Sequence, residues 1–146
     1  MTEIERAYLE TNYSCAYCGF RGKESLTIDH IEGRSIPHAN EYDNLIVLCH
    51  NCHHRKTNPK GITVKDVKKI KRILTQNYLA IYGINVLKLC MRNKNGVVAM
   101  PFLVLHLLEM GLLKQHEEQM GYGNTSVTLR YTITEKGKRV YNKFIK

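Results

Sequence analysis

The chain has 146 residues and a formal net charge of +9, which leaves room for one ordinary domain or two small ones. It has no apolar run long enough to span a membrane, no repeat and no low-complexity tract, so integral membrane proteins and repeat proteins are excluded. The positive charge favours a polyanionic partner, and the lack of a signal peptide predicts a cytoplasmic location in which cysteines stay reduced.

Two C-x-x-C pairs lie in the first half of the chain, Cys15/Cys18 and Cys49/Cys52. Each pair can supply two thiolates at roughly 2.3 Å from an ion, and two such pairs suit one tetrahedral four-cysteine zinc site. Ordinary buried thiols and disulfides are the alternatives, which the paired spacing and a reducing compartment disfavour. The sequence therefore predicts a structural Zn²⁺ ion held by these four cysteines.

Local patterns between and after the two pairs predict a strand, a loop, a strand and a helix. Leu26 to His30 suits a first strand, and the apolar run Leu45 to Leu48 suits a second. Glycine, proline and asparagine between them indicate a surface loop. A short basic helix is expected from Asn51 to Thr57, because Asn58-Pro59 follows. So small a unit has little hydrophobic core, so we expect its folding to depend on zinc.

A basic amphipathic helix is predicted over residues 63–82. Thr63 with Asp66 three residues later forms an N-terminal cap, and apolar residues then recur at spacings of three and four. Residues 63–96 carry eight Lys and Arg against one acidic residue, whereas residues 1–62 carry seven against eight. Phosphate affinity is therefore expected mainly from this helix, with a merely solvated basic face as the alternative. The candidate contacts are Lys65, Lys68, Lys69, Lys71 and Arg72.

The C-terminal third is predicted to combine helices with one hairpin. Its helical segments are separated by a polar turn, and the hairpin is joined across a glycine-rich connection from Gly121 to Asn124. The expected elements are helices over residues 84–91, 101–110 and 135–144 and strands over residues 112–119 and 126–134.

The N-terminal part resembles the HNH endonucleases, whose ββα-metal core is recognised by motifs in a fixed order. Here these motifs are Cys15-x-x-Cys18, then Asp29-His30-Ile31, then the run from Asn44-Leu45 through Cys49-x-x-Cys52-His53 to Lys56. The resemblance covers roughly residues 10–58. It implies a ββα-metal fold and the hydrolysis of phosphodiester bonds in DNA.

The resemblance also implies a catalytic centre with a metal ion of its own. Asp29 and His53 would bind Mg²⁺ or another divalent cation and leave positions open for water and phosphate. His30 would be the general base, because an ordinary imidazole is mostly neutral at cytoplasmic pH. Asn44 would orient His30 through a side-chain hydrogen bond. The implied phosphate contacts beside this centre are Arg55 and Lys56. A strand end without catalytic activity is the alternative.

The C-terminal part, roughly residues 75–146, resembles winged-helix domains. The helix that reads the major groove in such domains would be residues 100–110, which offer almost no donors for base edges. The wing residues Asn124, Thr125 and Arg130, or the basic helix before the domain, are therefore better candidates for DNA contact. Protein binding, including a homodimer through this domain, is the alternative.

These features predict an α+β protein with a zinc-stapled ββα-metal unit over residues 1–62, a connecting helix over residues 63–82 and a winged-helix-like domain over residues 83–146. The predicted function is that of a metal-dependent DNA endonuclease of HNH type with no membrane partner. The alternatives are a zinc-stabilised regulator that binds nucleic acid without cutting it, a nuclease for RNA or branched DNA, and a homing or phage-packaging endonuclease.

Overall fold

The computed structural model describes residues 1–119 and 129–146, and the chain divides into two compact units, Met1–Thr75 and Gln76–Lys146. The boundary falls inside the long helix α3 (Val64–Arg92). The predicted wing residues Asn124 and Thr125 and the glycine-rich connection lie outside the described residues. No helix in the described part of the chain is both long and apolar enough to cross a membrane.

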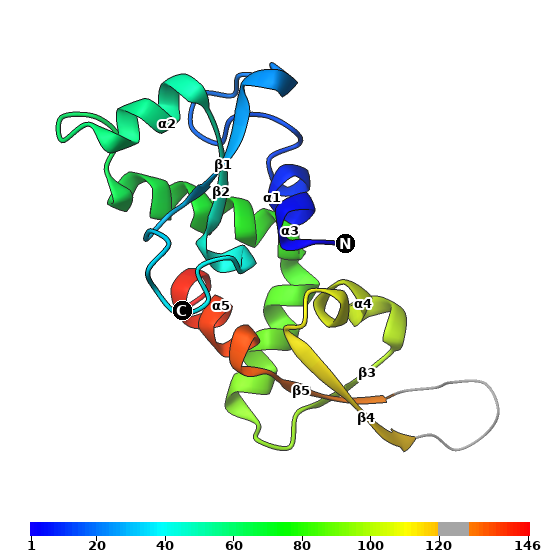
Figure 1. The fold of residues 1–146 in the computed structure, drawn as a ribbon. Coiled ribbons are helices and arrows are strands. Elements are labelled where there is room, and N and C mark those ends of the chain that lie inside the picture. Colours follow the sequence, from blue (N-terminus) through cyan, green and yellow to red (C-terminus); the bar gives the residue numbers. More distant parts are fainter. Residues whose placement is uncertain (120–128) are drawn as a thin grey trace. The chain divides into compact units, whose positions relative to one another are not determined.

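A two-stranded antiparallel sheet lies at the centre of the first unit (Figure 1). Strand β1 (Leu26–His30) pairs with β2 (Leu45–Cys49), with the first residue of each strand opposite the last residue of the other. Every residue of β2 is buried, because helices α1 (Glu3–Glu10) and α2 (His50–Thr57) both pack on this strand. Both strands lie where the sequence predicts, and a continuous apolar run is the pattern expected of a strand covered on both faces.

Helix α1 is an element that the sequence analysis did not predict. It begins with a capping box, in which the Glu5 N–H donates to Thr2 Oγ1 at 3.1 Å and the Thr2 N–H donates to Glu5 Oε2 at 2.7 Å. The sequence signal Thr-x-x-Glu was therefore present at positions 2 to 5. Two short 3₁₀ helices, η1 (Lys23–Ser25) and η2 (Tyr42–Asn44), precede the two strands.

A sharp turn at Gly61 joins α2 to α3. A Cβ atom at this position would lie 1.9 Å from the Arg55 carbonyl oxygen. Glycine therefore allows the close approach in which the Ile62 N–H donates to that same oxygen at 3.1 Å. Helix α3 then starts after Thr63, whose Oγ1 accepts from the Asp66 N–H at 3.1 Å, which confirms the predicted cap.

Lys71 on α3 is buried in the core of the first unit. Its Nζ lies 2.5 Å from Glu10 Oε2 on α1 and 3.6 Å from the centre of the Tyr42 ring. Burial lowers the pKa of Lys71, although the Glu10 carboxylate opposes this by favouring the charged form. The prediction that Lys71 contacts phosphate is wrong, because its charge is used inside the protein to join α3 to α1.

The second unit contains a three-stranded antiparallel sheet in the order β3-β5-β4 (Figure 1). Strand β3 was not predicted from the sequence; it has only three residues and forms by pairing with β5. The helices predicted over residues 63–82 and 84–91 correspond to the single element α3. This element has a kink at Ala80, where the backbone is not helical, with φ at 55° and ψ at 174°. The elements after α3 are β3 (Val97–Ala99), α4 (Pro101–Glu109), β4 (Leu113–Gln119), β5 (Leu129–Ile133) and α5 (Glu135–Phe144).

Candidate active site and metal centre

Four cysteine sulfurs converge in the first unit. The sulfurs of Cys15, Cys18, Cys49 and Cys52 all lie within 4.8 Å of one another, and the Cys18 and Cys49 sulfurs are 3.7 Å apart. Ligands at 2.3 Å in a tetrahedron around zinc are about 3.8 Å from each other, so this spacing suits a tetrahedral ion. None of the four forms a disulfide. The predicted cluster is therefore confirmed as a candidate zinc site.

The thiols of this cluster differ in acidity. Burial raises the pKa of the Cys15 thiol, but backbone N–H groups, including those of Cys18 and Cys49, outweigh it and bring the pKa down from 9.0 to about 7. Burial and the neighbouring sulfurs raise the pKa of the Cys52 thiol well above its usual range. Four thiolates cannot be crowded together without a compensating cation, so a bound Zn²⁺ ion would displace the remaining protons.

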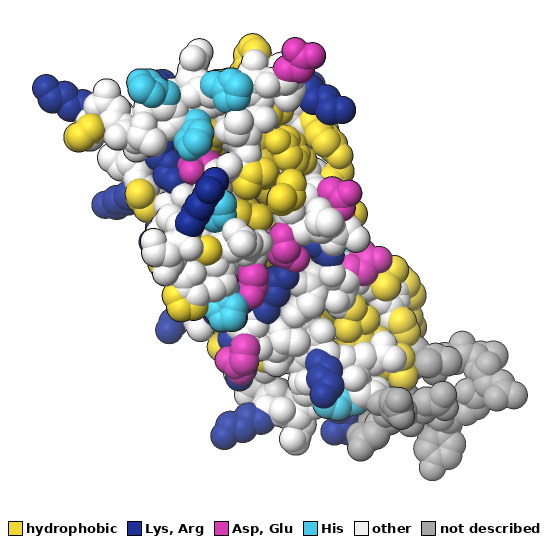
Figure 2. Space-filling view, viewed as in Figure 1, with side chains coloured by type: hydrophobic (Ala, Val, Ile, Leu, Met, Phe, Trp, Pro, Cys, Tyr) yellow, Lys and Arg dark blue, Asp and Glu magenta, His cyan; other side chains and the backbone are white. Residues whose placement is uncertain are grey.

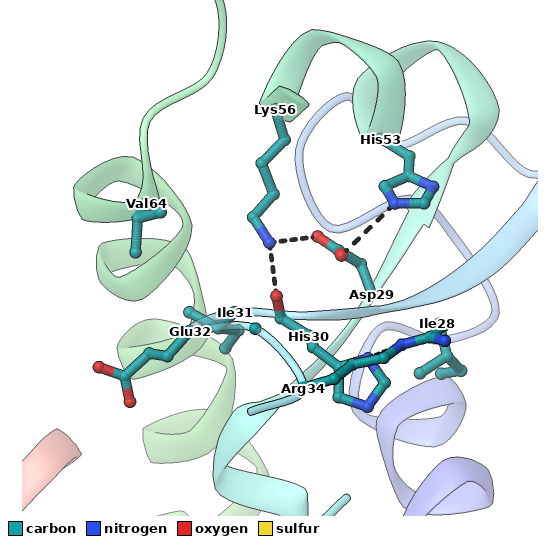
Figure 3. Close-up of a pocket in the computed structure, with 10 residues that line it drawn as sticks. Ile28, Asp29, His30, Ile31, Glu32, Arg34, His53, Lys56 and Val64 are labelled. Atoms are coloured by element: carbon teal, nitrogen blue, oxygen red, sulfur yellow. Dashed lines mark hydrogen bonds and ion pairs between the residues drawn. The ribbon is translucent and has the colours of Figure 1, made fainter. Parts of the chain in front are cut away.

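A hollow of about 670 Å³ opens beside the end of β1, and Figure 3 shows the side chains around it. His53 Nε2 on α2 lies 3.5 Å from Asp29 Oδ1 on β1. Asp29 is 8% exposed. A carboxylate oxygen and an imidazole nitrogen at this separation form a donor pair that suits a divalent cation. The polar residues around the hollow are Asp29, His30, Glu32, Arg34, His53 and Lys56.

The cysteine cluster and the sheet position these two candidate ligands. Asp29 pairs with Ile46 in the sheet, while His53 directly follows Cys52 on α2. A metal ion on the cysteines would therefore fix the helix that carries His53. Histidine side chains gather on the surface over α2, with Lys and Arg side chains next to them (Figure 2).

His30 leaves β1 on the opposite side from Asp29 (Figure 3). Its Nε2 lies 2.9 Å from Asn40 Oδ1, and because an amide oxygen can only accept, Nε2 carries the hydrogen. The other ring nitrogen, Nδ1, is then unprotonated and accepts from Arg34 Nε at 3.4 Å. This tautomer keeps Nδ1 unprotonated, as a general base requires, and Arg34 is the group that occupies its lone pair.

Asn44 does not contact His30, which corrects the predicted hydrogen bond between them. Its Oδ1 accepts from the Glu32 N–H at 2.9 Å, and its Nδ2 donates to the carbonyl oxygens of Gly33 and Ala39 at 3.0 and 2.9 Å. The amide is 1% exposed, and both of its hydrogens are used. Asn44 therefore holds the loop between the strands. Asn40, in that same loop, contacts His30, and sequence reasoning missed it.

Lys56 also differs from its prediction as a phosphate contact. Its Nζ lies 2.6 Å from Asp29 Oδ2 and donates to the His30 carbonyl oxygen at 2.6 Å. Arg55 is exposed and lies over the Tyr17 ring, 5.6 Å from its centre. Lys68 pairs with Glu32 at 2.5 Å. Among the remaining predicted phosphate contacts, Lys65, Lys69 and Arg72 are exposed on α3. Arg130 is half-buried on β5.

In the comparison with known proteins, a family model matches part of the chain. No curated protein and no solved structure matches this chain. The family model described as HNH endonuclease matches residues 15–59. This range contains all four clustered cysteines and the two candidate ligands Asp29 and His53. Residues 15–59 therefore match the HNH endonuclease family model, and this segment includes the cysteine cluster and most of the residues around the hollow beside β1.

Proposed function

We propose that this protein is a metal-dependent endonuclease that hydrolyses phosphodiester bonds in DNA. The observation that carries the proposal is the approach of His53 Nε2 to Asp29 Oδ1 at 3.5 Å in a hollow that the general-base candidate His30 also lines. All three residues lie in the matched segment. A structural Zn²⁺ ion on the four cysteines completes the proposal, because it would anchor α2 and with it His53.

The residues of the hollow suit the chemistry of phosphodiester hydrolysis. A divalent ion held by Asp29 and His53 would neutralise charge on the phosphate and on the leaving oxygen. His30 Nδ1 would accept the proton of the attacking water, and Asn40 would hold the ring in the tautomer that permits this. Arg34, exposed at the rim and 3.4 Å from His30 Nδ1, is placed to contact a phosphate oxygen.

Incubation with supercoiled plasmid tests this proposal directly. We expect nicked or linear product with Mg²⁺, Mn²⁺ or Ni²⁺ and none with EDTA, because the leaving oxygen would then lack its counter-charge. The same incubation with Asp29→Ala protein controls for a contaminating nuclease. Intact plasmid with all three metals, at a protein concentration that binds DNA, would instead support a zinc-stabilised regulator. The ion pair between Lys56 and Asp29 at 2.6 Å favours that second candidate, because a lysine already neutralises the ligand carboxylate.

Phosphate affinity is proposed to come largely from one face of α3. Lys65, Lys69 and Arg72 recur at spacings of four and three residues, so they share a helix face, and all three are exposed. Replacing the three with Ala should weaken binding to DNA of any sequence. For each phosphate that the variant no longer neutralises, the slope of log K against log salt concentration should fall by about 0.9. Salt titrations of binding by fluorescence anisotropy measure this slope.

Lys68→Ala is the matched control for that triple variant, because Lys68 pairs with Glu32 and should contribute less. An unchanged salt slope in the triple variant would show that the basic face is only solvated. Arg130 on β5 would then be the next residue to test for DNA binding.

The second unit is proposed to be a winged-helix-like domain that pairs with a second copy through α4. Val104 and Leu107 bury one side of this helix, while Phe102 and Leu105 on another side are 70% and 53% exposed. Figure 2 shows hydrophobic side chains on the surface over α4. A helix that is apolar all round is normally buried, and a face without charges can meet its own copy without repulsion.

Phe102→Glu combined with Leu105→Glu should convert such a dimer into a monomer, because carboxylates would be buried against each other at the interface. Sedimentation equilibrium of both proteins measures the mass. A monomeric wild-type protein at micromolar concentration would contradict the dimer, and the C-terminal unit would then need another partner.

A further inference from the structure

Lys56 places a positive charge inside the hollow that is proposed to bind a cation. Its side chain is 11% exposed, and its Nζ lies 2.6 Å from Asp29 Oδ2 and 2.6 Å from the His30 carbonyl oxygen. Lys56 follows His53 by three residues on α2, so both side chains reach the same carboxylate from one helix face (Figure 3). His53 faces Oδ1 and Lys56 faces Oδ2. The two oxygens of one carboxylate thus have different neighbours.

The charges around the hollow balance each other. Its two acidic residues are Asp29 and Glu32, and its two strongly basic residues are Lys56 and Arg34. Glu32 is further compensated by Lys68, whose Nζ lies 2.5 Å from Glu32 Oε1. A divalent cation that enters this hollow in the free protein therefore finds no net negative charge to attract it. Such a cation needs negative charge from elsewhere to bind tightly.

We propose that Lys56 makes divalent-metal binding depend on a bound phosphodiester. The ammonium group cancels the charge of Asp29 in the free protein and reserves Oδ2, so that only Oδ1 and His53 Nε2 are left to hold the ion. A phosphate group in the hollow brings the missing negative charge, and metal and nucleic acid then raise each other's affinity by the same factor. This inference rests on the proposed function, because it assigns the phosphate of a nucleic acid as the second ligand.

The test measures Mn²⁺ affinity on protein without DNA, by electron paramagnetic resonance of the free Mn²⁺ ion. Lys56→Met should bind Mn²⁺ about tenfold more tightly than wild-type protein, because it removes a repelling charge within a few ångströms of the ion. Lys56→Arg keeps the charge and should stay near wild type. Lys60→Met is the matched control, since Lys60 is exposed and outside the hollow, and it should leave Mn²⁺ affinity unchanged.

The dependence on phosphate is measured in a His30→Ala background, which prevents cleavage of the probe. A short DNA duplex should tighten Mn²⁺ binding about tenfold or more when Lys56 is present, and by much less in the His30→Ala, Lys56→Met protein. Lys56→Gln is a second uncharged variant, for use if Lys56→Met destabilises the fold. The glutamine amide can still donate a hydrogen bond to the His30 carbonyl oxygen. Zinc content and circular dichroism verify folding in each case.

Three results would overturn this inference. The first is a Mn²⁺ affinity that is unchanged or weaker in both Lys56→Met and Lys56→Gln. The second is a gain in Mn²⁺ affinity in the Lys60→Met control equal to the gain in Lys56→Met. The third is no Mn²⁺ binding with or without DNA. Plasmid cleavage tests the proposed function separately. Cleavage without tighter Mn²⁺ binding in Lys56→Met overturns only the inference about Lys56. Tighter binding that DNA modulates, without cleavage by wild-type protein, supports the inference and overturns the nuclease.

Discussion

His30→Ala should lower the rate of plasmid cleavage by about a hundred- to ten-thousand-fold, the usual cost of removing a general base. The reason is geometric, since His30 is the residue at the hollow whose unprotonated Nδ1 is fixed by a hydrogen bond at its other nitrogen, 2.9 Å from Asn40 Oδ1. Single-turnover cleavage at saturating DNA and metal measures the chemical step, free of changes in binding. Zinc content and DNA affinity should remain near wild type.

Asn40 and Asn44 give a matched pair of variants for the same experiment. Asn40→Ala should lower the cleavage rate while leaving thermal stability nearly unchanged, because Asn40 is exposed and its main contribution is to fix the tautomer of His30. Asn44→Ala should instead lower thermal stability, because Asn44 is buried and its removal leaves three backbone groups of the loop between the strands without their partner. A His30→Ala protein that cuts at the wild-type rate would remove His30 from the mechanism, and Asn40 with it.

Cys49→Ser should lose the bound zinc and unfold the first unit. Zinc bound to small four-ligand domains contributes roughly 10–16 kcal/mol of apparent binding free energy, whereas whole domains are stable by only about 5–15 kcal/mol. Loss of one thiolate would therefore remove most of what stabilises a unit whose sheet has two strands. Metal analysis by mass spectrometry and far-ultraviolet circular dichroism measure the two effects.

Cys90→Ser is the control for that experiment, because Cys90 is a buried thiol of the second unit that stands outside the cluster. It should keep one zinc ion per chain. Asp29→Ala and His53→Ala should keep the zinc as well and lose only activity that depends on the second metal. Full zinc occupancy in Cys49→Ser would refute a site that needs all four sulfurs.

The sequence alone determined the elements whose signals are local. Strands β1 and β2 and helix α2 follow from apolar runs, a basic segment and a proline, all within a few residues of each element. The spacing of the two C-x-x-C pairs also predicted their convergence, because this spacing is typical of ligands that share one zinc ion. Asp29 and His53 were named as candidate ligands through the resemblance to the HNH endonucleases, and the structure places His53 Nε2 3.5 Å from Asp29 Oδ1.

Only the tertiary structure decided which residue of a given type makes which contact. Asn40 and Asn44 lie in one loop, and the path of that loop decides their hydrogen bonds. Asn40 bonds to the His30 ring, whereas Asn44 bonds to backbone groups of the loop. Lys71 and Lys56 look like their neighbours in a basic sequence, but each meets a carboxylate from a distant element. Strand β3 forms only because β5 pairs with it. Burial and pairing are properties of neighbours in space, and no local pattern encodes them.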